Sequence, residues 1–275
     1  ALFFLIGIHM DLDQLKKCTH YRKEILVGGL MIYVLTPILA FIAAYFTSGS
    51  LGNAFIAIGV SAAAIGSPVV FSNIGRGEGG LALIISSLSL LGGLLLIPLL
   101  LFGFGVGFPI TDFAVENLLF IGVPLLAGLG SQRFQDVLFE DFKHHFSKLA
   151  LWLLILVMGV QFQMVYQAQG LGFITELGIG VLLMTTFVMF SYGLSYLISR
   201  ELGIMERNAR TIGIVAGSKG IAIALFIAAQ FGGEAVAFVS AYYFVRQAVI
   251  GGIAEYFHYG ETRIFEKLKS SALRQ

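Results

Sequence analysis

The chain has 275 residues, of which 57% are hydrophobic and 12% charged, with a mean hydropathy of +0.89. This composition excludes a water-soluble globular fold, because too few polar side chains remain to cover a solvated surface. The formal net charge of +1 is spread over many short connections, so nothing supports a nucleic-acid-binding function. A single cysteine, Cys18, excludes disulfide frameworks and thiolate metal sites. We therefore expect no enzyme activity, no metal and no cofactor.

Apolar runs of about twenty residues follow one another along the chain, which is the length that crosses a bilayer core of about 30 Å as a helix. They predict an all-α polytopic membrane protein whose immediate partner is the lipid bilayer. The predicted spans cover residues 24–46, 53–73, 80–104, 117–130, 148–165, 177–199, 211–230 and 235–256. Residues 1–10 are too few to cross, and we expect them to be the end of a helix that begins upstream.

The basic residues predict the orientation of the spans. Fifteen of the 17 Lys and Arg residues lie in alternate connections and in the tail 257–275, whereas the intervening connections, such as 105–116, contain none. Because basic residues are retained on the cytoplasmic side of a membrane, the tail is predicted to be cytoplasmic and the 105–116 connection extracytoplasmic.

Two of the spans contain helix-breaking sequence near mid-membrane. These are Gly66-Ser67-Pro68 in the span 53–73 and Gly217-Ser218-Lys219-Gly220 in the span 211–230. We predict that both spans are discontinuous, the alternative being a simple packing kink. The charge pattern orients the two spans oppositely, which predicts two inverted repeats, an N-terminally incomplete one at 1–104 and a second at 117–256.

Two basic residues, Lys219 and Arg246, lie inside spans, and no acidic residue occupies the central third of any predicted span. A charge at that depth costs at least about 2.5 kcal/mol and normally faces the interior of the bundle. A positive interior predicts an anionic ligand, which Arg246 would bind through paired hydrogen bonds. The alternatives are that Lys219 snorkels to the interface and that Arg246 pairs with backbone carbonyls in a structural role.

The predicted substrate-binding residues are the polar side chains of the two breaks and of the spans that follow them. They are Ser67, Ser72, Asn73, Ser86, Ser87, Ser218, Lys219, Arg246 and Gln247.

With these features the chain resembles the bile acid:sodium symporter family and its wider superfamily of anion and auxin carriers. The resemblance is carried by Phe4 to Ile8 with Asp11-Leu12, Ser67-Pro68 with Ser72-Asn73, Leu81 to Ser87 with Pro98 to Leu100, Pro124 to Gly128 with Arg133, and Arg210-Thr211 with Gly217 and Ala222 to Ala224. It implies two inverted five-helix repeats with two crossed discontinuous helices, divided into a core and a panel domain, with the family's first helix missing from the chain.

The sequence departs from that family at the sodium site. Sodium-coupled members read Glu-x-Gly-x-Gln-Asn in the ninth helix, whereas Val215, Gly217, Lys219 and Gly220 occupy the corresponding positions here. An ammonium in this place should repel sodium, because a hard cation needs oxygen ligands. We predict that the Lys219 ammonium occupies roughly the space of the missing sodium and holds the crossed half-helices together through their carbonyl ends. A buried lysine can also lose its proton, which would allow proton coupling.

The sequence thus predicts a secondary transporter that moves a small organic anion by alternating access and is not coupled to sodium. One alternative is a monovalent cation:proton antiporter, since residues 2–12 and 217–224 also resemble that family. Another is a membrane sensor or anchor. The sequence does not indicate an oligomeric state.

Overall fold

The structure, a computed structural model, describes residues 19–103, 105, 110–131 and 170–272, with further positions at 3, 4, 7, 152, 155, 156, 158–160 and 162–167. Several predictions concern residues outside this set: Asp11, Leu12, Cys18, Arg133, residues 106–109 of the 105–116 connection, part of the span 148–165 and the end of the tail.

The described chain is helical, with one isolated backbone bridge and no strand among these residues. Its helices are α3 (Arg22–Leu30), the π-helix η2 (Met31–Leu35), α4 (Thr36–Thr47), α5 (Gly49–Val60), α6 (Gly66–Ile74), α7 (Gly79–Gly103), α8 (Ile110–Asn117), the π-helix η3 (Leu118–Gly122), α9 (Val123–Ser131), α12 (Leu171–Glu201), α13 (Glu206–Gly217), α14 (Ile221–Ala229) and α15 (Gly233–Ala272).

Five helices in the described part of the chain are long and apolar enough to cross a bilayer. They are Arg22–Thr47, Gly79–Gly103, Asp112–Ser131, Gly172–Glu201 and Gly233–Tyr259. Their outward faces are apolar, as lipid contact requires, with Phe46, Leu95 and Phe120 strongly exposed. The prediction of an integral membrane protein is confirmed.

Two further spans are interrupted. Helices α13 and α14 are separated by Ser218, Lys219 and Gly220, as predicted, and α5 and α6 are separated by residues 61–65. The first break therefore precedes Gly66-Ser67-Pro68, the tripeptide at which the sequence predicts it. These three residues form the first turn of α6, a position that tolerates proline because its missing N–H would have no helical partner there.

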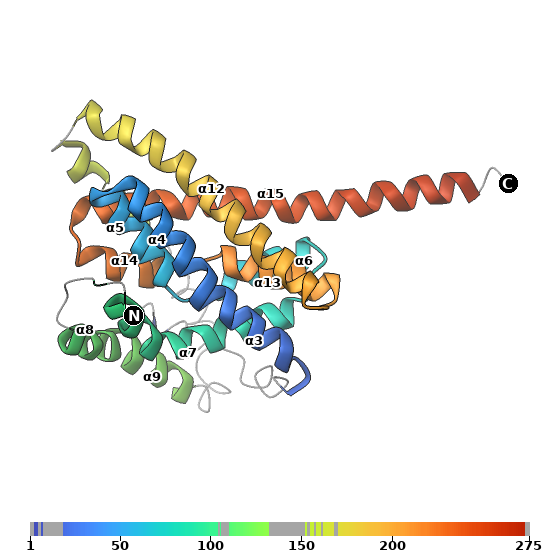
Figure 1. Ribbon diagram of the computed structural model, residues 1–275, viewed down its shortest axis with the longest axis horizontal. Coiled ribbons are helices and arrows are strands. Elements are labelled where there is room, and N and C mark those ends of the chain that lie inside the picture. Colours follow the sequence, from blue (N-terminus) through green and yellow to red (C-terminus); the bar gives the residue numbers. More distant parts are fainter. Residues whose placement is uncertain are drawn as a thin grey trace.

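The half-helices lie on opposite sides of the breaks. Figure 1 shows α5 and α14 toward one end of the bundle and α6 and α13 toward the other. Buried apolar residues of three of these segments, such as Ile58, Ile214 and Ile223, belong to one hydrophobic core with Tyr242 of α15. Helix α15 then continues well past the bundle (Figure 1). The breaks thus lie inside the protein, between the two ends.

Candidate functional site

The two breaks meet in the interior and pair with each other. The backbone N–H of Ala64 donates to the carbonyl of Ser218 at 2.8 Å, and the N–H of Gly220 donates to the carbonyl of Ala62 at 2.7 Å. These bonds make Ala63 and Lys219 an isolated antiparallel bridge. Backbone N–H and C=O groups that are not in a helix still need hydrogen-bond partners inside a membrane. Each break supplies such partners to some of the backbone groups of the other. Both spans are therefore discontinuous, and their interrupted segments cross.

Lys219 is fully buried at this crossing, with an exposed fraction of 0%. Its Nζ donates to the carbonyl oxygens of Ile32 at 2.8 Å, Gly59 at 3.0 Å and Ser61 at 3.0 Å. The side chain therefore does not snorkel to the interface. All three N–H bonds of the ammonium are used, so the amine occupies a cage of backbone oxygens.

Local structure explains why these carbonyls are available. Gly59 lies in the last turn of α5, where carbonyls lack helical donors and carry the negative end of the helix dipole. Ser61 lies in the break itself. Ile32 lies in the π-helix η2, a rare distortion that shifts the hydrogen-bond pattern and is frequent at functional sites. The ammonium thus joins the crossing to a neighbouring span, Arg22–Thr47.

Helix α15 holds the second break from the other side. The Tyr242 hydroxyl donates to the carbonyl of Gly217 at 3.2 Å and accepts from the N–H of Lys219 at 3.4 Å. One turn later, Nη1 of Arg246 donates to the carbonyl of Lys219. Both side chains are buried, and Arg246 is only 2% exposed. The structural alternative for Arg246, pairing with a carbonyl, is therefore observed for one of its nitrogens.

Helix α7 contacts the first break through Ser89, as α15 contacts the second break through Tyr242 and Arg246. Its Oγ accepts a hydrogen bond from the N–H of Ala63 at 3.1 Å and donates to the carbonyl of Ser86 at 2.9 Å. The Tyr33 hydroxyl donates to the carbonyl of Ser89. Ser86 and Ser87 are among the predicted site residues and Ser89 is not, although all three belong to the same serine-rich stretch.

We expect Ser89→Ala to lower the free energy of unfolding by about 1–2 kcal/mol, because it leaves the buried N–H of Ala63 without a partner. Ser87→Ala is the matched control, since Ser87 is equally buried in α7 and its hydroxyl makes no hydrogen bond in the described structure. Denaturant unfolding in detergent measures both. Equal effects of the two variants would show that Ser89 does not support the break.

Several of the predicted site residues carry buried polar atoms that have no hydrogen-bond partner among the described residues. These atoms are Oγ of Ser67, Ser72, Ser86, Ser87 and Ser218, Nε of Arg246 and Oε1 of Gln247. Buried polar groups are nearly always paired, so these unpaired atoms indicate positions where water or a ligand binds.

The predicted residues do not all lie at the crossing. Ser218, Lys219 and Arg246 lie together there. Ser72 and Asn73 lie at the C-terminal end of α6, where Asn73 is exposed and packs against Gly79. No contact in the described structure links these two residues to Lys219 or Arg246.

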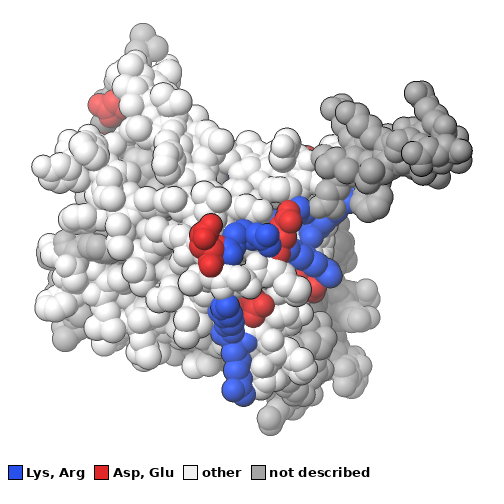
Figure 2. Space-filling view, turned by 45° about the vertical axis from the view of Figure 1, so that its right-hand side comes forward, with Lys and Arg blue, Asp and Glu red and all other residues white. Residues whose placement is uncertain are grey.

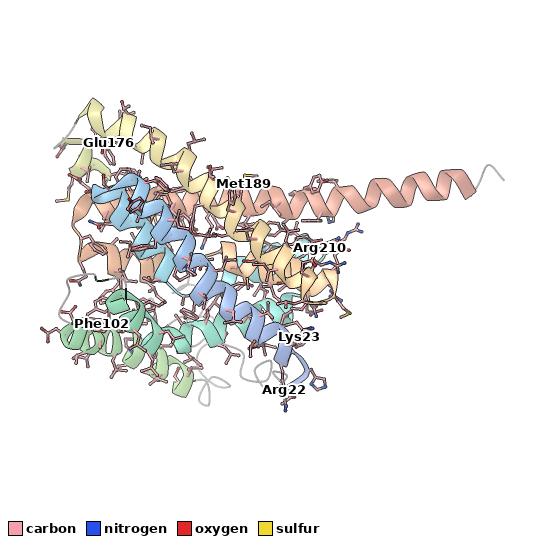
Figure 3. The ribbon with its side chains drawn as sticks, viewed as in Figure 1. Arg22, Lys23, Phe102, Glu176, Met189 and Arg210 are labelled. Carbon is pink, nitrogen blue, oxygen red and sulfur yellow. The ribbon has the colours of Figure 1, made fainter. Side chains whose placement is uncertain are left out.

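The charged residues around the outer ends of α6 and α13, away from the breaks, form a network. We call this the basic end, because it carries Arg22, Lys23, Arg207 and Arg210. Figure 3 shows Arg22, Lys23 and Arg210 at this end, with Glu176 and Phe102 at the opposite one. In Figure 2, the Lys and Arg of the visible face gather in one region with several acids among them. Basic residues from distant connections thus lie on one side, as the span assignment requires.

Contacts within the basic end join the α6–α7 turn to α13. Arg207 forms an ion pair with Glu78 at 2.8 Å and donates from Nε to the carbonyl of Gly77 at 3.0 Å. The N–H of Glu78 donates to Oγ1 of Thr211 at 2.7 Å. Since the Arg207 side chain is 62% exposed, its ion pair contributes little stability, and we assign these residues a structural role.

An open cavity of about 510 Å³ lies at the other end of the bundle, between the α4–α5 turn, α12 and the start of α15. Its lining includes Glu176 and Glu234, and Ser50 donates to Oε2 of Glu234 at 2.6 Å. Two carboxylates would repel an anion, so this cavity does not provide the anion site that the sequence predicts.

Comparison with models of known protein families supports a membrane transporter. The model of the SBF-like CPA transporter family matches residues 1–245, which is most of the chain. Among curated proteins, no relative matches significantly.

Proposed function

The chain belongs to the SBF-like CPA transporter family, and on that premise we propose that it is a secondary transporter moving a small organic anion by alternating access. Family membership and the apolar helices support transport through a membrane rather than catalysis. The anion is inferred from charge: the crossing buries Lys219 and Arg246, and no carboxylate of the described residues contacts either of them.

The unpaired nitrogen of Arg246 is the observation that carries this proposal. Nη1 is engaged with the Lys219 carbonyl, whereas the buried Nε has no partner in the described structure. Nε and Nη2 form the edge of a guanidinium that binds a carboxylate through two parallel hydrogen bonds. A carboxylate on this edge would satisfy Nε and neutralise the buried charge. The nearby α14 begins directly after the break, so its N-terminal N–H groups add partial positive charge.

Sodium independence follows from the cage around Lys219. Its three carbonyls already bind a cation that is covalently part of the protein, so an inorganic cation would have to compete with a tethered amine. The ammonium also compensates the negative end of α5 where the two breaks cross. We infer that the Lys219 ammonium does as a tethered group what a bound metal ion does in sodium-coupled relatives.

The inverted repeats, the core and panel domains and the cytoplasmic location of the basic end and the C-terminus are part of the proposal. Supporting the repeats, each broken span is followed by a helix that gives a hydroxyl to its break, Ser89 from α7 and Tyr242 from α15. Supporting the orientation, Arg210 stacks on Phe257 at 4.4 Å, which brings the end of the last span to the basic end.

Uptake of radiolabelled carboxylates of increasing size, such as acetate, succinate and cholate, into liposomes under imposed sodium and proton gradients tests the proposal. We expect uptake of at least one carboxylate and no stimulation by a sodium gradient. Exchange of sodium for protons without anion uptake would establish the cation antiporter instead. Absence of all movement would favour a sensor or anchor.

We expect the rate of anion uptake by the wild type to change with pH, and Lys219→Arg to flatten that change. The reason is that a guanidinium keeps its proton across the whole accessible range, whereas an amine can release it. Uptake is measured at equal internal and external pH. An identical pH profile in both proteins would exclude Lys219 as the titrating group.

A further inference from the structure

The carbonyl of Ile32 differs from the other two carbonyls that bind Lys219. It accepts hydrogen bonds from Nζ of Lys219 at 2.8 Å and from Oγ1 of Thr36 at 2.7 Å. Gly59 and Ser61 accept from Nζ at 3.0 Å, and no second donor reaches their carbonyls within the described part of the chain. Ile32 therefore keeps a partner if the amine leaves, whereas Gly59 and Ser61 do not.

The number of N–H bonds on Nζ determines how many carbonyls Lys219 can bind before and after it loses a proton. An ammonium has three N–H bonds, and the structure uses all of them. When it gives one proton to water, the neutral amine keeps two N–H bonds and gains a lone pair, which a carbonyl oxygen repels. One of the three carbonyls must separate from Nζ.

The separating carbonyl is that of Ile32. Gly59 and Ser61 lie in and beside the first break, which is bonded to the Lys219 segment itself, whereas Ile32 belongs to the neighbouring span. Releasing Ile32 leaves no buried acceptor unpaired, because the Thr36 hydroxyl remains on it. If the carbonyl of Gly59 or Ser61 separated from Nζ instead, that buried carbonyl would have no donor among the described residues.

We propose that Ile32 and Thr36 form a release point, at which loss of the Lys219 proton detaches the span Arg22–Thr47 from the crossed breaks. This inference rests on the proposed transport function, since it names the element through which a proton would drive the conformational change. The distortion of η2 is central to it, because a π-turn is a point where a helix can change its bonding pattern locally.

The surroundings of Nζ contain few other groups that could titrate in its place. Tyr33 of η2 lies beside Ile32, and Tyr242 and Arg246 of α15 contact the backbone of Lys219. The other described helices that form the crossing, α5, α6, α7 and α14, contain no ionisable side chain, and those of α13 lie at its first turns, Glu206, Arg207 and Arg210.

Hydrogen–deuterium exchange of the full chain in detergent tests the release point without any transported ligand. The measured quantity is the exchange rate of residues 28–36 divided by that of residues 40–46 in the same span, so that the intrinsic pH dependence of exchange cancels. For the wild type we expect this ratio to rise through a midpoint as pH increases. Lys219→Arg should remove the midpoint.

Thr36→Val should move the midpoint upward by about one pH unit, because among the described residues it removes the only donor that remains on Ile32 after deprotonation and so disfavours the released state. Thr47→Val is the matched control, since Thr47 makes the same bond to the carbonyl four residues earlier, at 2.8 Å, away from Lys219. It should leave the midpoint unchanged, as should Thr36→Ser, which keeps the hydroxyl.

A ratio that does not change with pH in the wild type, or an equal shift in Thr36→Val and Thr47→Val, would overturn the release point. Anion uptake is measured separately in liposomes. Anion uptake together with an exchange ratio that does not change with pH would support the proposed transport function and exclude the release point. A pH-dependent ratio without any uptake would retain the release point and remove the anion transport function.

Discussion

Replacing Lys219 by methionine is expected to lower the free energy of unfolding by about 3–5 kcal/mol, the largest loss expected from a single substitution at the crossing. Methionine keeps most of the apolar stem of the side chain but removes all three N–H donors. This leaves the carbonyls of Gly59 and Ser61 without a partner and the end of α5 uncompensated. Each buried acceptor without a donor costs about 1–3 kcal/mol. Denaturant or thermal unfolding in detergent measures the loss.

Lys23→Met is the matched control. Lys23 also donates to a backbone carbonyl, that of Leu202 at 2.5 Å, but it lies exposed at the basic end. Water replaces an exposed donor, so this variant should change the free energy of unfolding by no more than about 0.5 kcal/mol. A similar loss in both variants would mean that the cage around Lys219 has no special role in stability.

Replacing Arg246 by glutamine is expected to weaken binding of a transported carboxylate by about 10- to 100-fold. The substitution removes the Nε edge and the charge that the ligand would neutralise. It also removes one hydrogen bond to the carbonyl of Lys219, which should lower the free energy of unfolding by only about 1–2 kcal/mol. Calorimetry with a carboxylate that passes the uptake assay gives the affinity.

Two further variants separate charge from geometry. Arg246→Lys keeps the positive charge but lacks the planar fork, so its affinity should lie between those of the wild type and Arg246→Gln. Arg207→Gln removes an arginine that pairs with Glu78 at the basic end, and its affinity should equal that of the wild type. An unchanged affinity in Arg246→Gln would remove Arg246 from the binding site.

The second break was predictable because its own residues reveal it. Gly217, Gly220 and a charged Lys219 in an apolar span are each poor in a membrane helix, and together they mark an interruption. The first break was predicted in the right span but a few residues too late, because Gly66-Ser67-Pro68 begins α6, whereas the break itself, residues 61–65, contains no glycine or proline. It forms through distant partners, Ser89, Ser218 and Gly220, that no local pattern shows.

The sequence predicts that Lys219 binds carbonyl ends of the crossed half-helices, but it does not show which carbonyls these are. All three acceptors of Lys219 are backbone carbonyls, which every residue has, so Ile32 and Gly59 look like ordinary apolar positions. The π-turn that places Ile32 has no recognisable pattern in Met31–Leu35. Tyr242 likewise resembles one more aromatic residue of an apolar span until its hydroxyl is seen on the break. A buried amine on backbone carbonyls could be predicted, but the particular carbonyls could not.

The central proposal is that Lys219, at the crossing, acts as a tethered cation on three backbone carbonyls. Thermal unfolding of Lys219→Ala in ammonium, potassium, sodium and choline chlorides at equal ionic strength tests this role most directly. The alanine opens the cage, whose oxygens lie 2.8–3.0 Å from Nζ and so match an ammonium-sized ion. Ammonium should raise the unfolding midpoint of the variant well above its value in choline and leave the wild type unchanged. The same midpoint for the variant in all four salts would contradict the tethered-cation role.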